Sequence, residues 1–270
     1  MKQIGEGRTA EIFEHNDEKV LKLYRSGFPK KAIMYEYKVN TLIASLGIPA
    51  PKVYELVEVE DRIGILFQYI KGSSLIHKTV QNPLELKRYA KILAELHVLI
   101  HTHEIYTTDL SNQIRLQKEM LEHNIQQAKL LSDSEQMAII EHLEKLPNGR
   151  ALCHGDFHPD NAMVDEQQWI IDWMNGMIGH PAGDVARTLL LFRYGTLPEG
   201  IPSHFKEALS QMRDNMGDEY LDHYLTCTNL LFEEIDQWLL PVAAARLTEW
   251  IPDEEKEALL SFIRERLLLK

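Results

Sequence analysis

The segment ALCHGDFHPDNAMVD, residues 151–165, gathers several side chains that can do chemistry. Asp156 is followed five positions later by Asn161, and the strand-like run WIIDW contains Asp172. A carboxylate can accept the proton of a hydroxyl group, whereas an amide oxygen and a second carboxylate are ligands that suit Mg²⁺. The pattern therefore predicts that Asp156 is a catalytic base and that Asn161 and Asp172 bind a divalent cation.

A second pattern lies at the N-terminus, where IGEGRTAEI places Gly5 and Gly7 before a strand. Glycine lets the backbone approach a phosphate closely, because no side chain stands in the way. Rossmann and Walker loops open a helix, so both fit this context poorly. A glycine-rich hairpin over nucleotide phosphates, together with an Asp-to-Asn interval of five, is the arrangement of protein kinases.

That arrangement requires a lysine on the third strand and a glutamate on the helix that follows. KVLKLYR supplies Lys22. Glu36 stands three residues before Val39 and seven before Ile43, at the inward edge of the apolar stripe of its helix. A buried carboxylate without a cationic partner is costly. We therefore expect Glu36 to pair with Lys22.

Two other interpretations compete with a kinase. His154, Asp156 and His158 could form the site of a metal-dependent hydrolase, since the histidines are four residues apart. Gly155 and Pro159 make a regular helix improbable there, and this interpretation leaves the glycine-rich loop unexplained. The chain could instead be a non-catalytic nucleotide-binding regulatory protein, although the intact acidic residues argue against it.

The elements that must position these residues change in character along the chain. Apolar alternation predicts strands in AEIFEHND, KVLKLYR, KVYELVEVE and RIGILFQYI, with a helix in FPKKAIMYEYKVNTLIASLG. After Gly72, helical patterns dominate, near 83–101, 110–131, 133–145, 184–194, 204–214, 218–240 and 253–268. We expect an α+β fold with a strand-rich nucleotide-binding lobe over residues 1–70. Residues 71–270 would form a larger helical lobe for catalysis and acceptor binding, with a cleft between the two.

The composition narrows the compartment and the classes of partner that we expect. The 270 residues contain two cysteines, no membrane-spanning apolar run and no secretory h-region, which indicates a cytoplasmic protein without a membrane partner. The net charge of −12 disfavours nucleic acid as a partner. Residues 217–257 hold 11 acidic and 2 basic side chains, which indicates either a solvated surface or attraction of a cationic acceptor. Glu233 and Asp236 share a helix face and are the predicted acceptor-binding acids. Oligomeric state stays open.

HGDFHPDN and IIDW resemble the catalytic loop and metal-binding segment of the aminoglycoside phosphotransferase and choline kinase-like family of small-molecule kinases. IGEGRTAEIF, VLKLYR, YEYKVNTL, LAELH and GHPAGDVART extend the resemblance from about residue 4 to 190. It implies a protein-kinase-like fold and transfer of the γ-phosphoryl group of ATP, with Mg²⁺, to a hydroxyl of a small molecule. Ala10 replaces the third glycine of the loop, and the segment beyond about 195 matches nothing that would name the acceptor.

The resemblance also assigns roles to residues. Lys22 would bind the α- and β-phosphates, and Glu36 would position it. Adenine would meet the backbone near Gln68 and Ile70, while His154 and Asp184 would be scaffold for the catalytic loop. Only eleven residues separate Asp172 from Asp184, which is too short for the activation segment that protein kinases use, so a small-molecule acceptor is expected.

Overall fold

The structure, a computed structural model, describes residues 1–106, 114–196 and 203–268. The chain forms two compact units, Met1–Lys78 with Pro159–Gly176, and Thr79–His158 with Met177–Lys270. The division predicted near residue 70 lies close to the first of these breaks. The return of Pro159–Gly176 to the first unit was not foreseen, because the sequence there shows only two short strand-like runs.

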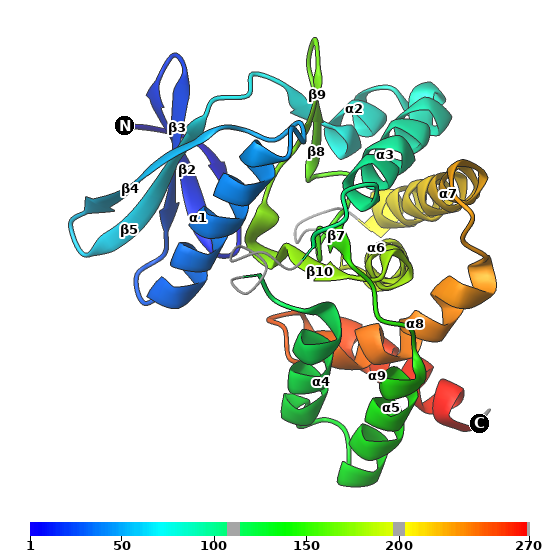
Figure 1. The fold of residues 1–270 in the computed structure, drawn as a ribbon. Coiled ribbons are helices and arrows are strands. Elements are labelled where there is room, and N and C mark those ends of the chain that lie inside the picture. The colour runs from blue at the N-terminus through cyan, green and yellow to red at the C-terminus, as the bar shows by residue number, and fades with distance from the viewer. Residues whose placement is uncertain (107–113, 197–202, 269–270) are drawn as a thin grey trace. The chain divides into compact units, whose positions relative to one another are not determined.

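A five-stranded antiparallel sheet forms the main part of the first unit, in the order β1-β2-β3-β5-β4 (Figure 1). Its strands are β1 (Lys2–Glu6), β2 (Ala10–Asn16), β3 (Lys19–Tyr24), β4 (Val53–Val59) and β5 (Arg62–Gln68). The four strands expected from apolar alternation are present. β1 was missed as a strand because its side chains are almost all exposed and give no alternation.

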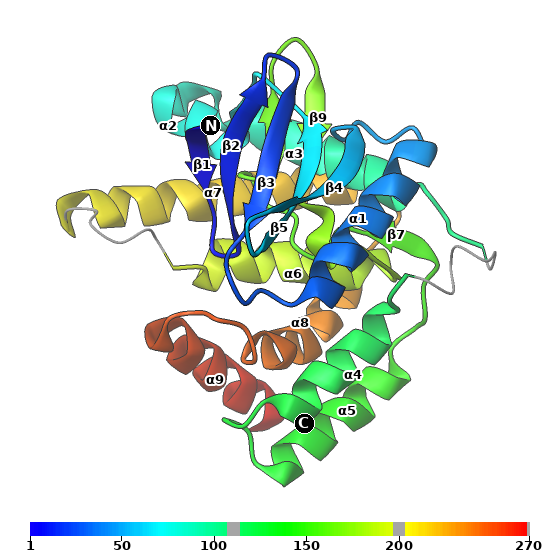
Figure 2. The ribbon, with the colours of Figure 1, turned by 90° about the vertical axis from the view of Figure 1, so that its left-hand side faces the viewer.

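Helix α1 (Lys30–Ser45) lies along this sheet (Figure 2). Side chains alternate between the faces of a strand, so on β3 Leu21 and Leu23 face one side and Tyr24 the other. Tyr24 packs in one cluster with Ile33 of α1, whereas Leu21 and Leu23 pack in a separate cluster. Lys22 shares the face of Tyr24 and is therefore directed toward α1.

A second, three-stranded sheet completes the first unit. Its order is β6-β8-β9, formed by β6 (Ser73–Ser74), β8 (Ala162–Val164) and β9 (Gln168–Ile170). The hairpin of β8 and β9 leads into the short 3₁₀ helix η3 (Trp173–Asn175). Helix α2 (Leu75–Gln81) follows β6 and crosses the boundary between the units along the chain.

The second unit is mainly helical. Its elements are η1 (Pro83–Glu85), α3 (Leu86–His101), α4 (Gln117–Gln127), α5 (Asp133–Lys145), β7 (Ala151–Cys153), β10 (Met177–Gly179), α6 (Pro181–Tyr194), α7 (Ser203–Cys227), α8 (Phe232–Arg246) and α9 (Asp253–Leu268). Strands β7 and β10 pair antiparallel, with Cys153 opposite Met177. Helices α3 and α7 lie side by side (Figures 1 and 2).

Most of the expected helices are present. The separate helices expected over 204–214 and 218–240 are wrong: α7 runs from Ser203 to Cys227, and α8 begins at Phe232 after a break. The break was missed because TNLL, residues 228–231, contains neither glycine nor proline. Part of the helix expected over 110–131 falls on residues 110–113, outside the described residues. Pro241 lies inside α8, as expected.

Within the described residues, every helix is too short or too polar to cross a lipid bilayer. Cys153 is buried and Cys227 exposed, and both are free thiols.

Candidate functional site

The glycines of the N-terminal loop are not required by the fold itself. Gly5 lies in β1 and Gly7 directly after it, and the Gly7 N–H closes the turn by donating to the Ala10 carbonyl at 2.8 Å. A methyl group placed on either glycine would meet no atom closer than 3.5 Å. Neither glycine has a positive φ angle. Packing and backbone conformation therefore both tolerate a side chain here, and the role of the two glycines in binding a phosphate stays a prediction.

Lys22 stands between two carboxylates of the first unit. Its Nζ lies 2.7 Å from Glu36 Oε1 and 2.8 Å from Asp172 Oδ1. The Glu36 side chain is 1% exposed, whereas that of Asp172 is 43% exposed. The Tyr24 hydroxyl donates to the second oxygen of Glu36 at 2.5 Å. The pair expected between Lys22 and Glu36 is present, and Asp172 joins it.

The two carboxylates keep Lys22 charged. Burial alone would lower its pKa, but Asp172 and then Glu36 outweigh burial, so the pKa of Lys22 rises above its ordinary value. Removing one partner of a buried ion pair typically costs about 3–5 kcal/mol, because it leaves an uncompensated charge. The cluster therefore presents a permanent cation whose exposed neighbour, Asp172, can still meet a ligand.

The hairpin of β8 and β9 brings Asn161 and Asp172 together. Ala162 pairs with Ile170, and the Ile171 N–H donates to the Asn161 carbonyl at 2.9 Å. Asn161 and Asp172 therefore flank the open end of the hairpin. Asp172 has a left-handed backbone, with φ 63° and ψ 59°, a conformation uncommon outside glycine but tolerated by aspartate. This residue lies two positions after the end of β9 and turns the chain into η3.

Asp172 was expected inside an apolar strand, and that expectation is wrong. Its carboxylate is partly exposed because the chain leaves β9 at Ile170, two residues earlier. The Asn161 side chain is buried. An amide and a carboxylate at one hairpin end are the oxygen donors that Mg²⁺ prefers, so the pairing of types at this end fits a magnesium site.

The residues expected near adenine lie where β5 ends. Gln68 is the last residue of β5, and its N–H donates to the Lys52 carbonyl at 2.8 Å. Its side-chain oxygen accepts from the Lys52 N–H at 3.2 Å. Ile70 is buried two residues later. This segment is held at a defined position in the first unit, and its contact with adenine stays a prediction.

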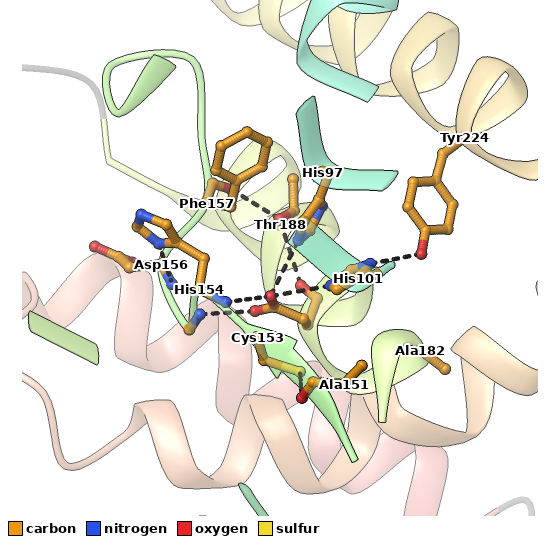
Figure 3. Close-up of polar contacts among 12 residues, drawn as sticks. His97, His101, Ala151, Cys153, His154, Asp156, Phe157, Ala182, Thr188 and Tyr224 are labelled. Atoms are coloured by element: carbon orange, nitrogen blue, oxygen red, sulfur yellow. Dashed lines mark hydrogen bonds and ion pairs between the residues drawn. The ribbon is translucent and has the colours of Figure 1, made fainter. Parts of the chain in front are cut away.

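In the second unit, Asp184 holds the backbone of the loop that carries Asp156. Figure 3 shows His154 and Asp156 of this loop. The Asp184 carboxylate accepts from the His154 N–H at 2.6 Å and from the Gly155 N–H at 2.8 Å. Gly155 has a φ of +76°, a conformation that favours glycine. The His154 ring accepts from the Asp156 N–H at 3.3 Å. His154 and Asp184 thus act on the shape of the loop in this structure.

Two histidines of α3 complete the shell around Asp184. His97 Nε2 and His101 Nε2 lie 3.1 and 3.2 Å from Asp184 Oδ2. Because a carboxylate only accepts, each Nε2 carries the proton. His97 Nδ1 lies 2.6 Å from the Tyr220 hydroxyl, and His101 Nδ1 lies 2.7 Å from the Tyr224 hydroxyl. Burial, and then the neighbouring His101, lower the pKa of His97 to about 3, so its ring is neutral.

Asp156 lies on the anchored loop, beside Arg187 and His158 of its own unit. Arg187 Nη2 lies 2.9 Å from Asp156 Oδ1, and His158 Nε2 lies 3.8 Å from Oδ2. Burial would raise the pKa of Asp156, but His158 and Arg187 outweigh it and hold the pKa well below its usual range. Asp156 is therefore a carboxylate across the whole physiological pH range.

The hydrolase alternative loses its basis in this geometry. His154 is buried and its Nδ1 faces the Asp156 N–H. Within the described residues, the three side chains that gather with metal-ligating atoms close together are His97, His101 and Asp184, not His154, Asp156 and His158. The hydrogen bonds around Asp184 already engage all of those atoms.

The predicted acceptor acids lie at the far end of α8 from Asp156. Glu233 and Asp236 are in the first turns of this helix of 15 residues, which spans about 22 Å. Glu249, just beyond its last residue, bonds to Arg187 beside Asp156. The Asp236 carboxylate also makes a two-pronged ion pair with Arg266. Their positions therefore give no support to a role in binding an acceptor at Asp156.

The residues that sequence reasoning missed are Arg187, His101 and Glu249. Arg187 stands three residues after Asp184, so both lie on the same face of α6. Likewise, His101 is four residues after His97 on α3. These spacings were available as signals in GDVART and LHVLIH. Glu249 gave no such signal, because its contact depends on how the chain turns after α8.

Comparison with solved structures finds proteins of the same fold. The chain is 15% identical to a thermostable mutant of aminoglycoside phosphotransferase APH(4)-Ia, with 98% of this chain and 94% of that one covered and a TM-score of 0.65. It is 17% identical to the APH(2")-IIa of a streptomycin-ATP ternary complex, over 96% and 90%, with a TM-score of 0.62. At this identity the likeness concerns the fold, a protein-kinase-like α+β fold.

Among curated proteins, "Acyl-CoA dehydrogenase family member 10" of Mus musculus is 26% identical over 234 residues, 77% of this chain. The match spans 21% of the mouse protein's length, so it concerns one part of that protein. The model of the phosphotransferase enzyme family matches residues 1–224, well over half of the chain. The chain therefore belongs to the phosphotransferase enzyme family.

Proposed function

We propose that the chain transfers the γ-phosphoryl group of ATP, in the presence of Mg²⁺, to a hydroxyl group of a small molecule. The observation that carries this proposal is the Lys22 ammonium held between buried Glu36 and partly exposed Asp172. A buried lysine kept charged by two carboxylates is suited to binding phosphate oxygens. An exposed lysine without such partners would not indicate a phosphate-binding site in the same way.

The residues present fit the nucleotide and the metal. Lys22 would bind phosphates, Gly5 and Gly7 leave room for them, and Asn161 with Asp172 would hold Mg²⁺. When bound, the magnesium nucleotide supplies the electrophilic phosphoryl group. The chain's own contribution in this unit is to keep Lys22 charged and in place through Glu36 and Tyr24.

Asp156 would orient the acceptor hydroxyl and accept its proton. Its low pKa makes it a weak base, which favours orientation as its main contribution. Phosphoryl transfer through a loose transition state tolerates this, since the hydroxyl proton leaves late and catalysis depends mostly on positioning. The backbone bonds from His154 and Gly155 to Asp184 keep the loop fixed for this task.

A small acceptor is favoured by the short connection after Asp172. Only η3 and β10 separate Asp172 from the start of α6 at Pro181, and this leaves no length for a docking segment for a protein substrate. Solved relatives were obtained with streptomycin, gentamicin and hygromycin B. Cationic acceptors of this kind would suit the acidic stretch of residues 217–257.

The test is an acceptor panel with MgATP. ADP release would be followed with kanamycin, gentamicin, streptomycin, hygromycin B, choline and neutral sugars, each with and without EDTA. We expect release of ADP that requires both Mg²⁺ and one of the cationic acceptors. Tight nucleotide binding with no turnover on any acceptor would instead favour the non-catalytic regulatory alternative.

A further inference from the structure

An arginine of the second unit joins Asp156 to the turn that follows α8. Arg187 Nη2 lies 2.9 Å from Asp156 Oδ1 and 3.0 Å from Glu249 Oε2. Arg187 Nη1 also contacts Glu249 Oε1. One guanidinium therefore bonds both carboxylates, through the fork geometry that lysine cannot reproduce.

Glu249 is in turn held by a second ion pair. Arg246, the last residue of α8, donates from Nη1 to Glu249 Oε2 at 2.7 Å. Its Nε donates to Glu255 Oε1 at 2.8 Å. Glu255 Oε2 accepts from the Thr196 backbone N–H at 3.1 Å and from its hydroxyl at 2.8 Å. The chain of contacts thus ties the connection between α8 and α9 to the carboxylate of Asp156.

The burial of Arg187 does not favour the stability of the fold. Its side chain is 11% exposed, and its Nε has no hydrogen-bond partner in the described part of the chain. A buried donor without a partner costs free energy, and buried ion pairs are often no more stable than apolar replacements. Keeping an arginine beside Asp156 therefore costs free energy, and a contact with a purely structural role would not require that cost.

We propose that Arg187 is a positioning residue for phosphoryl transfer. It fixes the rotation of the Asp156 carboxylate through Oδ1, and Glu249 fixes Arg187. This inference rests on the proposed function, in which Asp156 orients the acceptor hydroxyl. Since positioning supplies most of the rate in such reactions, a shift of about 1 Å can lower turnover roughly 100-fold.

The test compares Arg187→Lys, Arg187→Met and Glu249→Gln in the full chain, with the most active acceptor of the panel above. Arg193→Met, an exposed arginine on the same helix, is the matched control. We expect kcat to fall about 100-fold in Arg187→Met, at least 10-fold in Arg187→Lys and about 3- to 10-fold in Glu249→Gln. The KM for ATP should stay within about twofold in all of them.

The split between kcat and KM separates positioning from a structural role, because a loosened fold would change both. If Arg187→Met fails to fold, Arg187→Lys and Glu249→Gln decide the matter, since they keep charge or shape. Folded Arg187 variants with wild-type kcat would overturn the proposal. Asp156→Asn in the same assay distinguishes failure of the proposed role of Asp156 from failure of the proposed role of Arg187. If Asp156→Asn keeps full turnover, the proposed role of Asp156 is wrong, whatever the Arg187 variants show.

Discussion

Lys22 and Glu36 form an ion pair at 2.7 Å between strand β3 and helix α1. The pair arises because Lys22 shares the sheet face of Tyr24, and Glu36 shares the buried face of α1 with Val39 and Ile43. Two simple periodicities, of strand and of helix, thus place a cation and an anion opposite each other. The proposed nucleotide-binding role of the first unit depends on this pair.

Glu36→Gln should weaken the use of ATP. Without the carboxylate, Lys22 loses one of the two anions that hold it in place, so kcat/KM for ATP should fall at least about 10-fold, or roughly 1.4 kcal/mol. Glu11→Gln is the control, because Glu11 pairs with Arg62 at 2.5 Å on the same sheet. Steady-state kinetics with varied ATP would measure both. Equal effects of the two substitutions would contradict a special role for Glu36.

Asp172→Asn should abolish Mg²⁺-dependent turnover while leaving the protein folded. The substitution removes a charged metal ligand, yet asparagine tolerates the left-handed backbone of this position, and the side chain is 43% exposed. A magnesium titration of ADP release, with thermal unfolding of the same sample, would check both parts. Turnover near that of the wild type would exclude Asp172 as a metal ligand.

Two glycines should respond to substitution in opposite ways. Gly7→Ala should leave the free energy of unfolding within about 0.5 kcal/mol of the wild type, since the added methyl meets only the Ala10 carbonyl oxygen, at an ordinary contact distance of 3.7 Å, and φ is not positive. It should raise the KM for ATP severalfold. Gly47→Ala should lower stability by about 1 kcal/mol, because φ is +73° there, with no change in KM. A stable Gly7→Ala protein with unchanged KM would remove the loop from the nucleotide site.

The second unit should lose stability as the pH falls below neutrality. His97 has a pKa of about 3 in the folded protein and an ordinary value of 6.5. Below pH 6.5 the unfolded chain binds a proton at this ring and the folded chain does not. The contribution of this ring to the free energy of unfolding is therefore fully present above pH 6.5 and declines toward pH 3. The loss from pH 7 to pH 5 should be about 2 kcal/mol from this group.

Urea unfolding at pH 7 and pH 5 would measure this loss in three proteins. His97→Gln, which removes the titrating ring, should show a smaller loss than the wild type, whereas His123→Gln, at an exposed position of α4, should behave like the wild type. An identical pH dependence in wild type and His97→Gln would mean that the buried ring does not cause the effect.

Local sequence patterns were sufficient to predict much of the first unit. Alternation in KVLKLYR and the apolar stripe of α1 place Lys22 against Glu36, and the hairpin around residue 166 places Asn161 near Asp172. Contacts that depend on tertiary turns could not be predicted. Arg187 meets Glu249 across 62 positions, and only the turn after α8 decides that meeting. The acceptor-binding role of Glu233 and Asp236 stays a prediction, and the break at residues 228–231 that places them in the first turns of α8 has no glycine or proline to signal it.

The proposed role of Asp156 is to orient a hydroxyl group for transfer of a phosphoryl group from ATP. The most direct test is ³¹P NMR of MgATP with the best acceptor of the panel, using wild-type protein and Asp156→Asn, a variant that keeps the shape of the side chain. We predict that the wild type forms ADP and a new phosphomonoester resonance in equal amounts. Asp156→Asn should form the product at least about 100-fold more slowly, with nucleotide affinity unchanged. Formation of the phosphomonoester at the wild-type rate by Asp156→Asn, or ADP and inorganic phosphate as the only products with every acceptor, would exclude this role of Asp156.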